Sequence, residues 1–460
     1  MSKKLYILSF LAGLLFITSC KEDEPQPITV NFTNATVGIS ASNAETDVTV
    51  TFSRPAPSSG SIELSVNTGS LVYGETNDFY TSPAMSGNKL TISYNAGDES
   101  AKFTIYPGSG LNIQQDEEIT VSFEQNNNLF IGTNTSVKIT FSENYVAASG
   151  TMEMNGGGAS FPNQAFIDLS KLIQTTVDKK SWDLGFYTAS GEHRVIVNSS
   201  ASVMARKLDK NDLTAVTASD TVGFKGVMTV PPPNYDPSIG SIAWVDSPDG
   251  KLATTAFGTI SSTDADNKVF IVKDAGGNNW KKVRVLKNGD NYTLQHADIA
   301  ATTFTSTTIN KDAAFNFIFF DLDNGIKSIE PKKDKWDLMY GSYTESLNLG
   351  GPGKNIPYSY NDYITINRHG VSVAMVKIAD IAYNSFSASN VAALTFKTEV
   401  NSLGATWRMG GGPNSAPALY TDRYFVIKDA ENNIYKLKFT RLTSTTGERG
   451  YPEFSIQLVQ

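Results

Sequence analysis

The triplet Trp-Asp-Leu occurs twice in the chain, at residues 182–184 and 336–338. Other landmarks recur in the same order, at nearly the same separation. Phe-Ile-Asp-Leu at 166–169 corresponds to Phe-Phe-Asp-Leu at 319–322, and Phe-Ile-Val-Lys-Asp-Ala at 270–275 corresponds to Phe-Val-Ile-Lys-Asp-Ala at 425–430. Ordered landmarks at a constant spacing indicate one structural unit used twice. The sequence therefore predicts tandem copies over residues 151–305 and 306–460, with Trp182 and Trp336 buried at equivalent positions.

The two copies differ most in one place. The segment Ser-Val-Met-Ala-Arg-Lys-Leu at 202–208 matches Ser-Val-Ala-Met-Val-Lys-Ile at 372–378, a larger separation than that of the triplets. The second copy therefore carries extra residues around 345–360. Loops tolerate insertions better than the elements that they connect, so we expect the common strands to be retained.

Short alternating runs dominate the rest of the chain, for example Val-Thr-Val-Thr-Phe at 48–52 and Ser-Val-Lys-Ile-Thr-Phe at 136–141. Apolar residues at every second position, between clusters of Gly, Asn, Asp and Ser, predict half-buried strands and an all-β protein. Residues 28–145 form a first block with the strand spacing of a β-sandwich. A Gly-rich stretch over 147–158 predicts a flexible boundary before the repeats. Only 164–172 and 212–218 leave room for short helices.

The N-terminus has the pattern of a secretory signal. Lys3 and Lys4 precede an apolar run at 5–16, which is too short to span a bilayer, and the run leads to Ile-Thr-Ser-Cys at 17–20. This ending resembles a lipobox, which implies a signal peptide at 1–20 and a lipid on Cys20; the alternative is an ordinary secretory signal with a chance Cys. Residues 21–27, Lys-Glu-Asp-Glu-Pro-Gln-Pro, form a charged and then extended tether that resembles the export signal of Bacteroidetes surface lipoproteins. We expect an outer-membrane protein that is anchored by lipid and exposed at the cell surface.

Composition narrows the function. Cys20 is the single cysteine, so neither an intramolecular disulfide nor a multi-thiolate metal site can form. A formal net charge of −8 argues against a nucleic-acid partner. The chain lacks His-Glu-x-x-His, Gly-x-Ser-x-Gly and Walker motifs. We therefore expect a binding protein and not an enzyme.

The first block resembles the Calx-beta domain. The resemblance lies in Asn-Asp-Phe-Tyr at 77–80, in the Gly-Asp-Glu turn at 97–99 before an alternating strand, and in Asp-Glu-Glu at 116–118 before another. Some members of that family bind calcium through clustered carboxylates, and the residues that would do so here are Asp78, Asp98, Asp116 and Glu117. Acidic residues are also common in solvated turns, so the favoured interpretation is that calcium is not bound.

The repeats resemble the HmuY family. The resemblance rests on Phe-x-Asp-Leu, on the Lys-rich lead into Trp-Asp-Leu, and on strands that end in Asn198 and Asn367. It rests also on the closing Tyr-Phe-Val-Ile-Lys-Asp-Ala and on Gly-Glu-Arg-Gly-Tyr-Pro-Glu-Phe at 447–454. The family's founding members are Bacteroidetes surface lipoproteins that bind haem. The resemblance implies an all-β, hand-like fold that holds haem between loops through two axial His or two axial Met side chains.

The chain offers few such ligands, because it contains three histidines and nine methionines. The candidates are Met204 with Met228 in the first unit, and His369 with Met409 in the second, and the first pair is favoured. In the matched stretch Met204 aligns with Ala374, and Met375 follows one position later, so Met375 should lie on the opposite face of its strand. We therefore expect at most one competent site. A methionine on a strand is more often core filler, and His369 has the setting of a turn residue.

A second class of function stays open. The β modules could serve as spacers of a surface adhesion or glycan-binding lipoprotein, with Tyr358, Tyr360 and Tyr363 stacking on sugars if they are exposed. An outer-membrane receptor is a further possible partner. Absorption titration with haemin is the experiment that separates the two classes.

Overall fold

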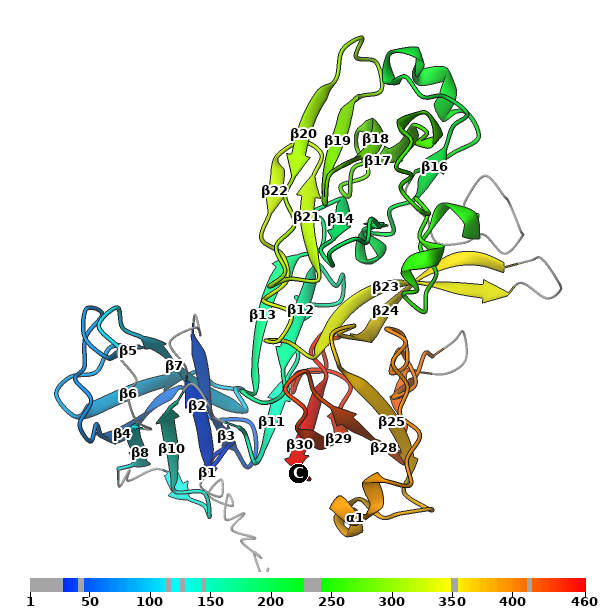
Figure 1. Cartoon of the computed structure of the whole chain (residues 1–460). Helices are drawn as coiled ribbons and strands as arrows, with labels where there is room; N and C mark the ends of the chain where they lie inside the picture. Colours follow the sequence, from blue (N-terminus) through cyan, green and yellow to red (C-terminus); the bar gives the residue numbers. More distant parts are fainter. Residues whose placement is uncertain are drawn as a thin grey trace, which may run out of the picture.

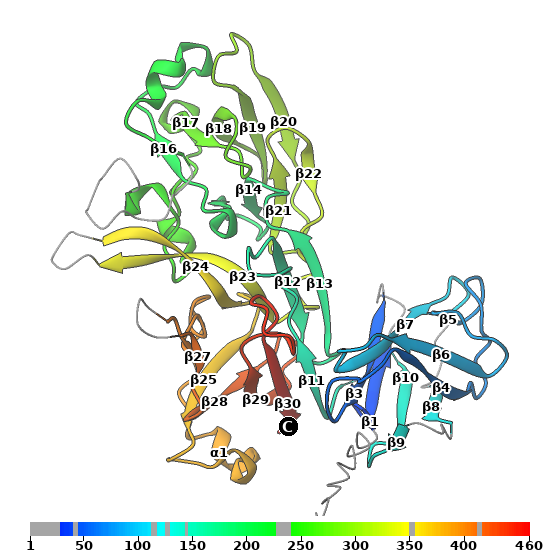
Figure 2. The ribbon, with the colours of Figure 1, turned by 180° about the vertical axis from the view of Figure 1, so that it is seen from behind.

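The computed structural model describes residues 28–39, 45–111, 117–124, 129–142, 146–226, 241–348, 355–411 and 416–460. Over these residues the protein is built almost entirely from β-strands, as the alternating sequence predicts, and one four-residue α-helix, α1 (Ala388–Val391), is present. Figures 1 and 2 show a β-sandwich at one side and two further bodies, one above the other.

The sandwich consists of two five-stranded sheets. In order across the first sheet, the strands are β5 (Phe79–Ser82), β7 (Ser100–Pro107), β3 (Thr46–Phe52), β1 (Ile28–Phe32) and β9 (Leu129–Ile131). Across the second they are β2 (Thr36–Ile39), β10 (Ser136–Phe141), β8 (Glu117–Phe123), β4 (Gly60–Asn67) and β6 (Lys89–Tyr94).

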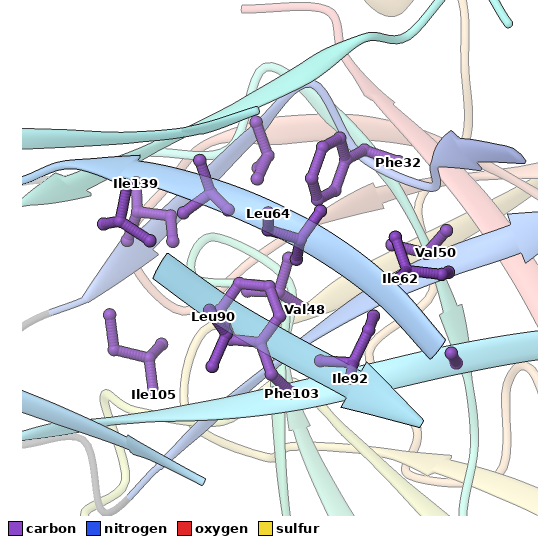
Figure 3. Packing of buried hydrophobic residues seen from close by; sticks show 14 of the residues in the cluster. Phe32, Val48, Val50, Ile62, Leu64, Leu90, Ile92, Phe103, Ile105 and Ile139 are labelled. Carbon is purple, nitrogen blue, oxygen red and sulfur yellow. The ribbon is translucent and has the colours of Figure 1, made fainter. Parts of the chain in front are cut away.

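Alternation along these strands forms the core of the sandwich. In β3, for example, Val48 and Val50 are buried, whereas Asp47 before them and Thr51 after them are exposed. Figure 3 shows the inward side chains of both sheets meeting in one layer, as the two-residue period of a strand requires. The sandwich therefore has its own apolar core.

The upper body is formed by residues 184–327 and is called here the inserted body. It has a five-stranded and a four-stranded sheet. The five-stranded sheet has the order β16 (Ala205–Lys207), β17 (Phe270–Lys273), β18 (Trp280–Asn288), β19 (Asn291–Asp298) and β20 (Thr305–Ile309). The four-stranded sheet has the order β15 (Val195–Val197), β14 (Leu184–Tyr187), β21 (Phe317–Asp321) and β22 (Gly325–Lys327).

The lower body, called here the split body, is made from two separate parts of the chain, 149–178 and 338–458. Its five-stranded sheet has the order β11 (Ser149–Glu153), β30 (Glu453–Leu458), β29 (Ile434–Arg441), β28 (Arg423–Lys428) and β25 (Ser372–Lys377). Its four-stranded sheet has the order β13 (Ile173–Asp178), β12 (Asn163–Asp168), β23 (Leu338–Asn348) and β24 (Asn355–Ile366). A small hairpin, β26 (Arg408–Met409) with β27 (Ala418–Leu419), accompanies them.

The two sequence repeats are interleaved. The hairpin β12–β13, which carries the first Phe-x-Asp-Leu, pairs with β23 after the second Trp-Asp-Leu. In the same way β21, which carries the second Phe-x-Asp-Leu, pairs with β14 after the first Trp-Asp-Leu. Each repeat thus gives its opening strands to the body that contains the rest of the other repeat. The strand orders of the two bodies correspond one to one, so the repeats fold alike although their strands are exchanged.

The structure tests three local expectations from the sequence. The stretch expected to be a flexible boundary includes β11, which pairs with the C-terminal strand β30, so the expected flexibility is wrong for residues 149–153. The possible helix at 164–172 is also wrong, because most of it is β12. At 212–218 the chain forms the short 3₁₀ turn Leu213–Ala215 and begins a second one, Ala218–Thr221.

The described extra residues of the second copy, at 345–348 and 355–360, lie in the outer part of the strands β23 and β24, which project from the body in Figure 1. These strands have 11 and 12 residues, whereas their counterparts β14 and β15 have 4 and 3. The remaining 3₁₀ turns lie at Ser199–Ala201, Ile242–Trp244, Leu252–Thr254, Asp264–Asp266 and Tyr383–Ser385. Among the described residues, no helix has the length and apolarity needed to cross a membrane.

Candidate functional sites

The seam between the inserted and split bodies is an aromatic cluster drawn from both repeats. Trp182 packs edge-on against Phe319 with ring centroids 4.7 Å apart, and Trp336 packs edge-on against Phe166 at 5.1 Å. Both tryptophans are buried, as the repeat predicts. Because the cluster contains equivalent residues from both copies, its packing contributes to the stability of both bodies.

The aspartate of each Trp-Asp-Leu ties the exchanged strands together. Asp183 accepts hydrogen bonds from the backbone N–H of Ala275, at 2.6 Å, and of Leu322, at 2.6 Å. Asp337 accepts the equivalent bonds from Ala430 and Leu169, both at 2.8 Å. Each carboxylate therefore joins the Lys-Asp-Ala turn of its own repeat to the Phe-x-Asp-Leu strand of the other. These aspartates have a structural role.

The asparagine that follows the corresponding strand in each repeat makes equivalent hydrogen bonds. Asn198 donates through Nδ2 to the carbonyls of Lys179 and Trp182, each at 2.7 Å. Asn367 donates in the same way to the carbonyls of Lys333 and Trp336, each at 2.7 Å. Both amides thus hold the segment in which the chain crosses from one body to the other.

A cavity of about 110 Å³ lies in the seam. Its apolar wall includes Trp182, Trp336 and Phe319, and its polar wall includes Asp246 and Glu330. Asp246 accepts from the N–H groups of residues 197 and 256, and Glu330 from those of residues 316 and 317. Burial raises the pKa of each carboxyl to about 7, although these hydrogen bonds oppose the rise.

A second, polar cavity of about 510 Å³ lies beside the seam. Arg368 and Asn316 line both cavities, so the two adjoin. The charged side chains in its wall are Lys311, Lys333, Arg368 and Asp290, and His369 also lines it. His369, a predicted haem ligand, is thus an exposed residue at a cationic cavity, in the turn that was expected for it.

Met204 and Met409 lie in different environments. Met204 has no exposed surface and packs in an apolar cluster with Leu213, Val216 and Phe224. Met228, its predicted partner, lies outside the described residues. Met409 is 45% exposed on β26 and does not line the cavity that contains His369. The structure therefore does not bring His369 and Met409 together at that cavity.

Sequence reasoning did not choose Met375, although it is 47% exposed on β25. The sulfur of Met375 is 3.8 Å from Nη1 of Arg423, which also donates to the carbonyl of Thr406, three residues before Met409. The guanidinium of Arg423 lies 3.9 Å from the ring centroid of Tyr420. We call Met375, Met409, Tyr420 and Arg423 the methionine face of the split body.

The tyrosines proposed for sugar stacking mostly pack on one another. Tyr363 is buried and stacks on Tyr343 at 5.1 Å, and its hydroxyl donates to Glu345 at 2.6 Å. Tyr358 and Tyr360 are half-buried and contact each other at 4.6 Å. Their rings therefore contribute to the packing of the long hairpin.

Three of the acidic residues considered for calcium are described, and each accepts a hydrogen bond from the protein itself. Asp78 accepts from the N–H of Val72 at 2.7 Å, Asp98 from that of Asn95 at 2.6 Å, and Glu117 from the hydroxyl of Ser70 at 2.9 Å. Asp116 lies outside the described residues, as do Cys20 and the rest of the signal region. Within the described ranges, no group of three or more His, Cys, Asp or Glu side chains could hold a metal ion.

Comparison with solved structures gives distant similarities. The crystal structure of the apo form of the Calx CBD1 domain has 16% identity and a TM-score of 0.21, and the match covers 25% of this chain and 96% of that one. A putative carbohydrate-binding protein from Bacteroides ovatus has 10% identity and a TM-score of 0.18, with 89% of this chain and 95% of that one covered. No curated protein matches the chain.

The family comparison is more informative, because it covers most of both repeats. The model described as HmuY protein matches twice, over residues 160–300 and 313–456. Both matches begin before a Phe-x-Asp-Leu motif and extend past the corresponding Lys-Asp-Ala motif. With a β-sandwich in front of its two repeats, the chain belongs to the HmuY family.

Proposed function

We propose that the protein is a lipid-anchored surface protein that binds haem, and that the methionine face of the split body is its site. Membership of the HmuY family supports a small ligand of the haem type. The observation that carries the choice of site is the exposure of Met375 and Met409, at 47% and 45%. Large apolar side chains are usually buried, so two exposed thioethers, of which Met375 contacts Arg423, suit a ligand better than a core.

The residues of the methionine face fit the chemistry of haem. Thioether sulfur is an established axial ligand of haem iron, which it stabilises in the reduced state. Met375 is paired with buried Phe425 across the sheet, so its side chain lies on a firm apolar base. Arg423 pairs with the neighbouring Asp422 at 2.7 and 3.1 Å, so a haem carboxylate at this face would share the guanidinium with Asp422, and the ring of Tyr420 beside it offers an apolar surface.

Met204 fits less well, because it has no exposed surface and its neighbours form a closed apolar cluster. A ligand on Met204 would require these side chains to separate. The pair Met204 with Met228 nevertheless stays a prediction that can be tested beside the new pair.

Absorption titration with haemin tests the proposal. The full mature chain should shift the Soret band with a saturable endpoint, and the double variant Met375→Leu with Met409→Leu should lose the shift. Leucine keeps the apolar volume and removes the sulfur, and Met204→Leu is the matched control that should bind as the wild type does. A shift that survives the double variant but disappears in Met204→Leu would overturn the choice of site, and no shift in the wild type would overturn the haem function.

A further inference from the structure

Trp336 breaks the symmetry of the seam. The indole N–H of Trp182 donates to Gln164 Oε1 at 2.8 Å. In the second repeat the position equivalent to Gln164, two residues before the Phe of Phe-x-Asp-Leu, is Phe317. Among the described residues, no atom accepts a hydrogen bond from Trp336 Nε1, although this nitrogen is buried. A buried donor without an acceptor lowers stability. Because Trp336 lines the seam cavity, a ligand acceptor in that cavity would recover this loss.

The adjoining polar cavity supplies positive charge. Lys311 is occupied, because its Nζ contacts Asp290 at 3.0 Å and two backbone carbonyls. Arg368 donates to the carbonyl of Gly250 and lies over the ring of Phe317 at 4.9 Å. Within the described part of the chain, no hydrogen bond or ion pair is made by Lys333 Nζ. Three cations therefore face one carboxylate, and one of the cations is free to pair with an anion.

The two carboxyl groups in the seam cavity do not supply a competing cation site. Asp246 and Glu330 each already accept two backbone N–H bonds. These donors hold each carboxyl against its own wall of the cavity. The space between the aromatic rings is therefore available to an apolar group.

We propose that the seam binds a small aromatic carboxylate, with its ring against the aromatic wall of the seam cavity and its carboxylate accepting from the Trp336 N–H and facing Arg368 and Lys333. An apolar cavity of about 150 Å³ is known to hold benzene. The seam cavity, at about 110 Å³, can therefore hold at most one aromatic ring, after its side chains adjust. A tetrapyrrole is several times too large. The seam site is therefore separate from the methionine face, and it requires both repeats.

Calorimetric titration of the full mature chain with benzoate, and with benzamide as its neutral counterpart, tests the site. Benzoate should bind and benzamide should bind more weakly, because the amide carries no charge. Trp336→Phe and Lys333→Met should each weaken benzoate binding by roughly three- to tenfold, the usual value of one hydrogen bond or partly exposed charge pair. Trp407→Phe and Lys332→Met are matched controls. The buried Trp407 N–H likewise has no acceptor among the described residues, but Trp407 does not line the cavity, and Lys332 is an exposed neighbour of Lys333 in the sequence. Both variants should bind benzoate within about twofold of the wild type.

The proposal is overturned if the wild type shows no binding up to about 10 mM benzoate, a concentration that would detect even a millimolar Kd. Equal affinity for benzamide would overturn the anionic part. Equal weakening in the controls would show a general effect of substitution and would also overturn the site. If Trp336→Phe lowers the melting temperature strongly, the benzoate affinities of Lys333→Met and Lys332→Met decide whether the site exists. Both lysines lie nearer the solvent than Trp336, so these substitutions disturb the fold less.

Discussion

The interleaving of the repeats predicts that the two bodies unfold together, and Trp182→Ala tests this. Trp182 is 4% exposed, packs on Phe319 from the other repeat, and donates a hydrogen bond to Gln164. Truncating a buried tryptophan to alanine costs about 3–5 kcal/mol. For bodies of this size each kcal/mol lowers the melting temperature by about 2–4 °C, so we expect a decrease of about 6–20 °C.

Differential scanning calorimetry of the full chain separates the outcomes. We expect one transition for the inserted and split bodies, moved as a whole by Trp182→Ala, and a separate transition for the sandwich. Phe103→Ala is the matched control, because Phe103 is buried in the sandwich core, which shares no residue with the seam. If Trp182→Ala instead splits the transition and leaves one body at its original temperature, the seam does not couple the bodies and the reasoning fails.

Two further predictions concern the pH dependence of stability and the membrane anchor. Burial raises the pKa of Glu330 from 4.5 to about 7, so the folded state keeps the proton on this carboxyl to a higher pH than the unfolded state does. The free energy of unfolding therefore falls by about 3 kcal/mol as pH rises from about 4.5 to 7. Glu330→Gln keeps an acceptor for the same two N–H groups, so it should flatten the fall in the free energy of unfolding between pH 5 and 7, measured by urea titration; an unchanged slope would refute this. Palmitate labelling in cells should tag the wild type and not Cys20→Ala, and equal labelling of both would end the proposal of a lipid anchor.

Much of the fold follows from local sequence. Alternating runs such as 48–52 predict strands because one face of each strand is buried, and the repeated motifs predict the matching roles of Asp183 and Asp337. The exchange of strands could not be predicted in this way. The two Phe-x-Asp-Leu strands offer nearly the same pairing edge, so each fits either body, and the choice depends on how the connecting segments cross the seam.

The candidate ligands show a similar limit. The one-residue slip between Met204 and Met375 predicts opposite faces, and the structure agrees, with exposed fractions of 0% and 47%. Met204 lies on the sheet face that the cluster around Phe224 covers. The equivalent face of the split body is covered by the cluster of Val376, Tyr424 and Val426, and Met375 lies on the opposite face, beside Phe425. The sequence therefore predicts that Met375 is shifted by one residue relative to Met204, but it does not predict that Met375 is exposed. Trp336 is a comparable case. The sequence shows Phe317 at the position equivalent to Gln164, but only the structure shows that Gln164 accepts from Trp182 and that Trp336 lacks such an acceptor among the described residues.

Identification of the axial ligands tests the central proposal most directly. Near-infrared magnetic circular dichroism of the ferric haemin complex distinguishes thioether from imidazole ligation by the energy of its charge-transfer band. Because Met375 and Met409 are the proposed ligands, the spectrum of the wild type should indicate two thioether sulfurs, and Met375→His should convert it to mixed imidazole and thioether ligation. A spectrum of two imidazoles in the wild type, or one that Met375→His leaves unchanged, would contradict the proposed site.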